Sequence, residues 1–200
     1  VLTAIGGSTN QTSVIDLKVI GTINSYDIVV LHDKMIELRY LDLSEARIVA
    51  NPYCYYENYC TEDDVLGPNS FREKSRLISI KLPAEIKSIG YNAFYNCQKL
   101  SEVVIPNSVT RIDEQAFSYC NSLQFITLPN KLEYIGSSAF AWGGLKEISF
   151  PTTLTRIEWG AFQSSQLETV RIPSSLQYIG SSAFQWCPNL KKVYTYTIEP

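Results

Sequence analysis

The sequence has one histidine, one methionine and no apolar run that approaches the roughly 20 residues of a membrane-spanning helix. The single histidine, His32, limits acid–base and metal chemistry, since imidazole is the commonest metal ligand and a frequent catalytic base. The signatures G-x-G-x-x-G, the Walker loop, H-E-x-x-H and C-x-x-C are all missing. We therefore predict no cofactor, no metal site and no membrane span within this chain.

Positive charge is also scarce. The 17 Lys and Arg residues are scattered and are outnumbered by 20 Asp and Glu residues, which gives a formal net charge of -3. A nucleic-acid surface needs a basic stripe that neutralises phosphates. We expect no nucleic-acid partner.

The most prominent feature of the sequence is one phrase that is repeated from Leu77 to Val193. Its first copy reads L-I-S-I-K-L-P-A-E-I-K-S-I-G-Y-N-A-F-Y-N-C-Q-K. The opening leucine returns every 22 or 23 residues, at Leu77, Leu100, Leu123, Leu145, Leu167 and Leu190. A fixed period of this length is typical of stacked-repeat proteins, whose single units cannot bury their own apolar face. We expect a solenoid with a long, thin core.

Each unit is predicted to contain a short strand, a bend and an outer turn. Apolar residues at the first, fourth and sixth places, such as Leu100, Val103 and Ile105, alternate like a strand with one inward face. Proline at the seventh place ends the strand because it cannot donate to a ladder. Two apolar residues three apart, such as Val109 and Ile112, return to the core, and the Ala-Phe pair that follows is expected to form a short helical turn. Parallel pairing of the strands about 4.8 Å apart predicts one curved sheet.

The N-terminal part departs from the repeat. Alternating apolar residues from Leu17 to Ile23 predict a strand, and Ile28, Leu31 and Met35 fall at helical spacing. This strand and helix are expected to cap the open end of the stack. We divide the chain into three parts. Residues 1–37 form the N-terminal entry and cap, residues 38–196 the repeats, and residues 197–200 a tail. The first repeat unit is atypical and has an insertion at about residues 51–64.

The phrase L-x-x-I-x-I-P…I-x-x-I-G…A-F-x-x-C resembles the BspA-like, or Treponema pallidum-type, leucine-rich repeat family of bacterial surface proteins. The run G-T-I-N-S-Y-D-I, followed by L-D-L-S-E-A-R-I-V, is similar to the capping region of Bacteroides-type surface proteins. The resemblance implies an α/β leucine-rich-repeat solenoid and a non-catalytic adhesion or interaction module. It also implies a protein that is secreted or anchored at the cell surface, on the outer membrane. Because the chain begins at Val1 and its only methionine is Met35, we expect its signal segment to be absent.

The strand face is the best candidate binding surface. Residues at the third and fifth places of successive units should stack into two outward columns, which would form an extended surface for a macromolecule. Val104 and Phe125 are apolar yet predicted to face outward, which either a binding patch or cover by neighbouring side chains would explain. The candidate ligand-binding residues are Lys81, Glu102, Val104, Phe125, Glu147, Arg171, Lys192 and Tyr194.

The partner of this face is expected to be an extracellular or host protein, or a glycan. Self-association through the C-terminal repeat edge is a further route, because an uncapped array exposes an apolar end. A second column on the outer side could stack on sugars or pack against the next repeat; its members are Asn96, Tyr119, Trp142, Ser164 and Trp186.

The five cysteines fall into two groups. Cys97, Cys120 and Cys187 share the third place after the phenylalanine, which indicates buried small apolar side chains. Cys54 and Cys60 lie six residues apart in the tyrosine-rich insertion. They could form a disulfide in an oxidising compartment or remain free, because spacing does not determine geometry.

Two further groups invite a chemical interpretation. His32 lies beside Asp33 in the predicted helix, where it could act as a general base or be a solvated helix residue. Three adjacent acids from Glu62 to Asp64 could touch a cation, but they lack the spacing of a calcium loop. We predict no enzymatic activity. The alternative to an interaction module is a structural spacer that presents another domain and has no ligand of its own.

Overall fold

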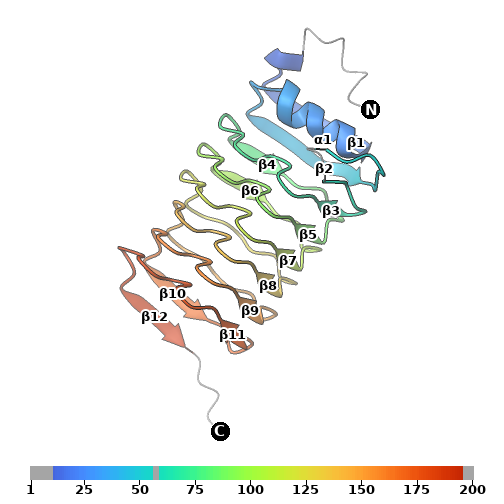
Figure 1. Cartoon of the computed structure of the whole chain (residues 1–200). Coiled ribbons are helices and arrows are strands. Elements are labelled where there is room, and N and C mark those ends of the chain that lie inside the picture. Colours follow the sequence, from blue (N-terminus) through green and yellow to red (C-terminus); the bar gives the residue numbers. More distant parts are fainter. Residues whose placement is uncertain (1–10, 56–58, 196–200) are drawn as a thin grey trace.

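The computed structural model describes residues 11–55 and 59–195 of the chain. Successive units form stacked coils whose strands run parallel, from the N-terminal strands to the C-terminal pair (Figure 1). The parallel-sheet solenoid predicted from the repeat is therefore confirmed. Within the described residues, every helix is too short or too polar to cross a bilayer.

The strands form three parallel sheets. The strand face carries a four-stranded sheet in the order β1 (Asp16–Ile23), β2 (Tyr40–Ile48), β4 (Ser79–Lys81) and β6 (Glu102–Val104). It also carries a two-stranded sheet of β10 (Thr169–Ile172) and β12 (Lys192–Thr195). We call the remaining six-stranded sheet the second sheet; its order is β3 (Val65–Leu66), β5 (Ser88–Ile89), β7 (Arg111–Ile112), β8 (Tyr134–Ile135), β9 (Arg156–Ile157) and β11 (Tyr178–Ile179).

The expectation of one curved sheet is wrong, because the strand face is interrupted. Between β6 and β10, the described residues of this face include no assigned strand, whereas the second sheet continues unbroken from β7 through β8 to β9. The interruption covers the two units that open at Leu123 and Leu145, which have 22 residues instead of 23. The break in the strand face thus coincides with the two shorter units.

The shortening lies in the outer turn. The segment from Phe140 to Leu145 is one residue shorter than the matching segment from Phe94 to Leu100. In this turn the chain lies so close to the preceding coil that a Cβ on Gly144 would be 2.1 Å from the carbonyl oxygen of Asn121, an approach that only glycine fits. The equally short turn of the next unit has Gln166 at this place, so the length alone does not require the glycine.

The outer turns are not the short helical turns that the sequence predicts. In the first regular unit, the N–H of Ala93 donates to the carbonyl of Gly90 at 3.1 Å, while the N–H of Phe94 donates across to Ala116 of the next coil at 2.8 Å. Asn92 has a left-handed φ of 55°. Because N–H groups alternate between the local turn and the neighbouring coil, they are not free to build a helix.

The phenylalanines of the Ala-Phe pairs fill the core, as predicted. Their rings stack with consecutive centroids 5.1 to 5.5 Å apart, in the order Phe71, Phe94, Phe117, Phe140, Phe162 and Phe184. The first five are fully buried. The fold thus has a continuous aromatic stack along its axis, on which every unit depends for packing.

The N-terminal strand and helix lie where the sequence predicts them. Helix α1 (Ser25–Val29) begins at Asn24, whose side chain accepts from the N–H of Tyr26 and whose own N–H donates to Asp27. A π-helical turn, Val30–Lys34, follows α1 directly. A 3-10 turn, Gln11–Ser13, precedes β1. The inward Ile28, Leu31 and Met35 are buried. Whether this unit acts as a cap stays a prediction.

The insertion of the first unit is partly described. Cys54 and Cys60 are joined by a disulfide, and the buried Tyr55 donates its hydroxyl to the carbonyl of Pro68 at 2.8 Å. Burial raises the pKa of the Tyr55 phenol to about 12. The first ten residues of the N-terminal segment, and residues 196–200 with the predicted tail, lie outside the described residues.

Candidate binding surface

The two predicted columns do face outward. Side chains at the first and fourth places of each full unit pack in or against the core, as Leu100 and Val103 do, and those at the third and fifth places are exposed or half-exposed. All eight candidate residues are exposed: Lys81, Glu102, Val104, Phe125, Glu147, Arg171, Lys192 and Tyr194. Their orientation is confirmed, while their role in binding stays a prediction.

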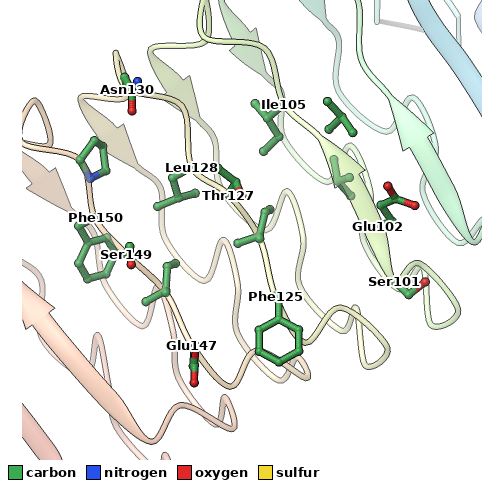
Figure 2. A pocket seen from close by; sticks show the side chains of 15 residues that line it. Ser101, Glu102, Ile105, Phe125, Thr127, Leu128, Asn130, Glu147, Ser149 and Phe150 are labelled. Atoms are coloured by element: carbon green, nitrogen blue, oxygen red, sulfur yellow. The ribbon is translucent and has the colours of Figure 1, made fainter.

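Four of the eight candidates lie around one hollow of about 830 Å³ on the strand face, which we call the strand-face hollow. Glu102, Val104, Phe125 and Glu147 line it, together with Thr127 and other residues of the same coils. Figure 2 shows Phe125 between Glu102 and Glu147, which come from the preceding and the following coil. The Phe125 side chain is 59% exposed and that of Val104 46%. Neighbouring side chains therefore do not cover them.

The backbone of the strand-face hollow is unpaired. Among the described residues, no partner accepts from the N–H groups of residues 125–128 and 147–150, although all eight line the hollow. The two coils are joined nearby, where the N–H of Lys146 donates to the carbonyl of Gln124 at 3.0 Å. Backbone donors without a protein partner need water or a ligand. The break in the sheet and the hollow are thus one feature.

The charged residues that line the strand-face hollow are both acids. Glu102 accepts a hydrogen bond from the hydroxyl of Ser79 at 3.1 Å. Glu147 makes no hydrogen bond or ion pair with a described residue. No Lys or Arg is found among the described residues that line the hollow. The hollow therefore carries negative charge.

The other four candidates lie outside the hollow. On the N-terminal side, Lys81 forms a 3.0 Å ion pair with Asp42 on β2. Hydrogen bonds from Ser44, and then from Lys81, hold the pKa of the Asp42 carboxyl well below its usual range. On the C-terminal side, Arg171 of β10 lies over the ring of Tyr194 on β12 at 4.3 Å, with Lys192 on the same strand. The strand face is thus acidic at its centre and basic at its C-terminal end.

The outer column is largely used for packing. Tyr119 and Trp142 stack with ring centroids 5.1 Å apart and an interplanar angle of 9°. Trp186 is 70% exposed and has no ring partner among the described residues. Tyr119 and Trp142 thus pack on each other, and Trp186 is the most open aromatic side chain of this column. Stacking of the column on sugars stays a prediction.

His32 is held between two segments. Its Nδ1 lies 2.6 Å from Asp33 Oδ1 and its Nε2 lies 2.7 Å from the carbonyl oxygen of Arg72. A second hollow of about 550 Å³ lies beside it, lined also by Tyr59 and Asn69. Because both ring nitrogens already have partners, the imidazole ties the N-terminal unit to the first repeat. Among the described residues, no cluster of three His, Cys, Asp or Glu could hold a metal ion.

Sequence reasoning missed an arginine–tyrosine ladder on the second sheet. The guanidinium of Arg111 lies 3.8 Å from the ring centroid of Tyr134, and that of Arg156 lies 4.2 Å from Tyr178. Arg156 also pairs with Glu158 at 2.5 Å. The alternation of R-I-D or R-I-E with Y-I-G at the repeat period was the signal that could have found it. Cation–π stacking between coils makes this ladder a stabilising feature of the second sheet.

The chain matches one protein family and several solved structures. A family model described as "BspA type Leucine rich repeat region" matches residues 64–191 in six copies. A solved T. pallidum leucine-rich repeat protein is similar, with 28% sequence identity and a TM-score of 0.61 over 64% of this chain and 60% of that chain. A leucine-rich repeat protein from Bacteroides ovatus has 29% identity and a TM-score of 0.56 over 72% of this chain and 44% of that chain. A leucine rich cell surface protein from Faecalibacterium prausnitzii shares the fold, with 22% identity and a TM-score of 0.54 over 90% of this chain and 49% of that chain. This chain covers less than two thirds of each of them. No curated protein sequence matches it.

Proposed function

The chain belongs to the BspA-type leucine-rich repeat family, and we propose on this basis that it is a non-catalytic interaction or adhesion module. It binds a macromolecular ligand on its strand face. The observation that carries the proposal is the strand-face hollow, where Phe125 and Val104 are exposed at column positions beside unpaired backbone donors. Exposed apolar side chains gathered in a hollow are typical of interaction sites.

We place the protein outside the cell, either secreted or at the cell surface. The printed name of the Faecalibacterium protein includes the words cell surface, although its 22% identity supports only a shared fold. The disulfide between Cys54 and Cys60 fits an oxidising compartment. The ligand under this proposal is an extracellular or host protein, or a glycan.

An array of extracellular-matrix proteins and glycans tests the proposal. The purified chain is compared with a Phe125→Ala, Arg171→Ala double variant and with a control, Trp186→Ala, which removes an exposed aromatic ring from the outer column. We expect saturable binding that the double variant loses while its circular dichroism melt is unchanged. The control should bind as the unmodified chain does.

Absence of binding would favour a different function. A well-folded chain that binds no protein and no glycan of the array would contradict the interaction module. The structural spacer, which presents another domain without a ligand of its own, would then be the better explanation. Binding that the Trp186 variant loses and the double variant keeps would move the site to the outer column.

A further inference from the structure

We propose that the strand-face hollow binds an extended polypeptide segment in which a lysine or arginine lies beside an apolar residue. This inference rests on the proposed function and names the chemistry of the partner. Three features of the hollow carry it: its charge, its exposed aromatic ring and its unpaired backbone.

The charge of the hollow selects a cation. Glu102 and Glu147 lie on the coils before and after that of Phe125, and no described lining residue is basic. Glu147 has no partner among the described residues, and Glu102 has one hydroxyl donor. A ligand that covers these carboxylates removes them from water, which costs free energy unless it supplies positive charge. A lysine ammonium or arginine guanidinium supplies it.

The exposed ring of Phe125 favours a ligand in which an apolar residue lies beside the Lys or Arg. Phe125 lies between the two acids and is 59% exposed, and Val104 lies on the preceding coil. The methylene stem of Lys or Arg packs on such a ring while its charged head reaches the carboxylates. The next side chain of the ligand can then cover Val104. Together they bury the apolar surface that the repeat leaves open.

The backbone selects a polypeptide. The N–H groups of residues 125–128 and 147–150 are unpaired among the described residues, and they belong to two neighbouring coils of the same face. An extended peptide carries carbonyl oxygens that can accept from such donors. An anionic glycan would be repelled by Glu102 and Glu147, and a neutral one would leave both carboxylates without a counter-charge.

Selection from a phage-displayed random heptapeptide library tests the inference. The targets are the full chain, the Glu102→Gln, Glu147→Gln variant and the Phe125→Ala variant. A matched control, Glu85→Gln, Glu168→Gln, changes the net charge equally at exposed acids that do not line the hollow. Circular dichroism melts verify that every variant folds.

We expect the full chain to enrich peptides with Lys or Arg next to an apolar residue. A synthetic copy of such a peptide should bind the Glu102→Gln, Glu147→Gln variant at least about tenfold more weakly than the full chain, a difference of about 1.4 kcal/mol. The Phe125→Ala variant should also bind it more weakly. The matched control should bind it as the full chain does, and added salt should weaken the complex.

Selection of neutral or acidic peptides, no selection at all, or enrichment that survives Glu102→Gln, Glu147→Gln would each overturn the inference. These results are separable from the proposed function. If the chain binds a matrix protein or a glycan through Phe125 but shows no preference for cationic peptides, the interaction module stands and this inference fails. If the chain binds nothing in either experiment, both fail.

Discussion

The thiol of Cys120 donates to the carbonyl oxygen of Phe94 on the preceding coil, with Sγ and O 3.2 Å apart. Cys97 and Cys187 make the same bond to the phenylalanine one unit earlier. In the first unit this place holds Lys74, which donates to the carbonyls of the preceding segment instead. The repeated cysteine is therefore a donor that joins coils as well as a small apolar side chain. It is buried at Cys97 and Cys120, as predicted, but only half-buried at Cys187.

Stability should fall with rising pH because of two buried thiols, those of Cys97 and Cys120. Burial raises the pKa of Cys97 to about 12 and that of Cys120 well above its ordinary 9.0. A group whose folded pKa is raised contributes stability fully below its unfolded pKa and loses it above that value. Above about pH 9, each thiol should therefore lower the free energy of unfolding by up to about 1.4 kcal/mol per pH unit.

Urea unfolding of Cys120→Ser between pH 8.5 and 10.5 measures this contribution. Serine keeps a hydrogen-bond donor and is accepted at this place of the repeat, since Ser165 is buried there. We expect the variant to show a shallower decrease than the unmodified chain. An unchanged slope would mean that the Cys120 thiol titrates normally in the folded state.

Lys74 should have the opposite effect in a lower pH range. Burial lowers the pKa of its amine from 10.5 to about 8, although the amine donates to His32 O and Met35 O at 2.7 Å each. The unfolded chain binds the extra proton between these two values, so stability rises with pH from about 8. We expect Lys74→Met to lose this rise between pH 7.5 and 9, measured by urea unfolding. A variant with the same slope as the unmodified chain would show that Lys74 stays charged in the folded protein.

Removing one ring from the phenylalanine stack should be costly. Phe117 lies 5.1 Å from Phe94 and 5.3 Å from Phe140 between ring centroids, and it is fully buried. We expect Phe117→Ala to lower the free energy of unfolding by about 3 to 5 kcal/mol. The matched control is Phe125→Ala, an exposed ring whose loss should change stability by no more than about 0.5 kcal/mol. Equal effects of the two changes would contradict the assignment of inward and outward positions.

The disulfide of the insertion should stabilise the first unit. Its loop is short, so the loss of chain entropy in the unfolded state predicts about 2 kcal/mol. Urea unfolding of Cys54→Ser, Cys60→Ser under oxidising conditions should show this decrease. Alkylation of the unreduced, unfolded chain should modify three cysteines and leave Cys54 and Cys60 unlabelled. Labelling of all five would disprove the bridge.

Most of the coil could be predicted because its signals are local and repeated. Leu100, Val103 and Phe117 are inward in the structure because their spacing allows no other face to be buried. The outer turn was predicted wrongly because the Ala-Phe segment has helical composition, whereas its N–H groups are divided between the turn and the next coil. Lys74 lies three residues after Phe71, at the place of the cysteine, but the sequence does not show that its amine reaches back to the carbonyls of His32 and Met35.

The candidate site was predicted only in part. The outward columns follow from strand alternation, and Phe125 and Val104 were identified from them as exposed apolar residues. Glu102 and Glu147 share one hollow with them, whereas Arg171 and Lys192 lie on a separate pair of strands. This grouping depends on which coils remain paired. Column position alone carries no such information.

The sequence by itself determined the solenoid, the inward residues and the two outward columns of this protein, because a period of 22 or 23 residues with fixed apolar places can bury its core only by stacking. The tertiary structure decided where the stack opens. The two units shortened by one residue stay paired on the second sheet but form no strand on the strand face, which the repeat length alone does not determine. The strand-face hollow, with its unpaired N–H groups and its two acids, lies at this break.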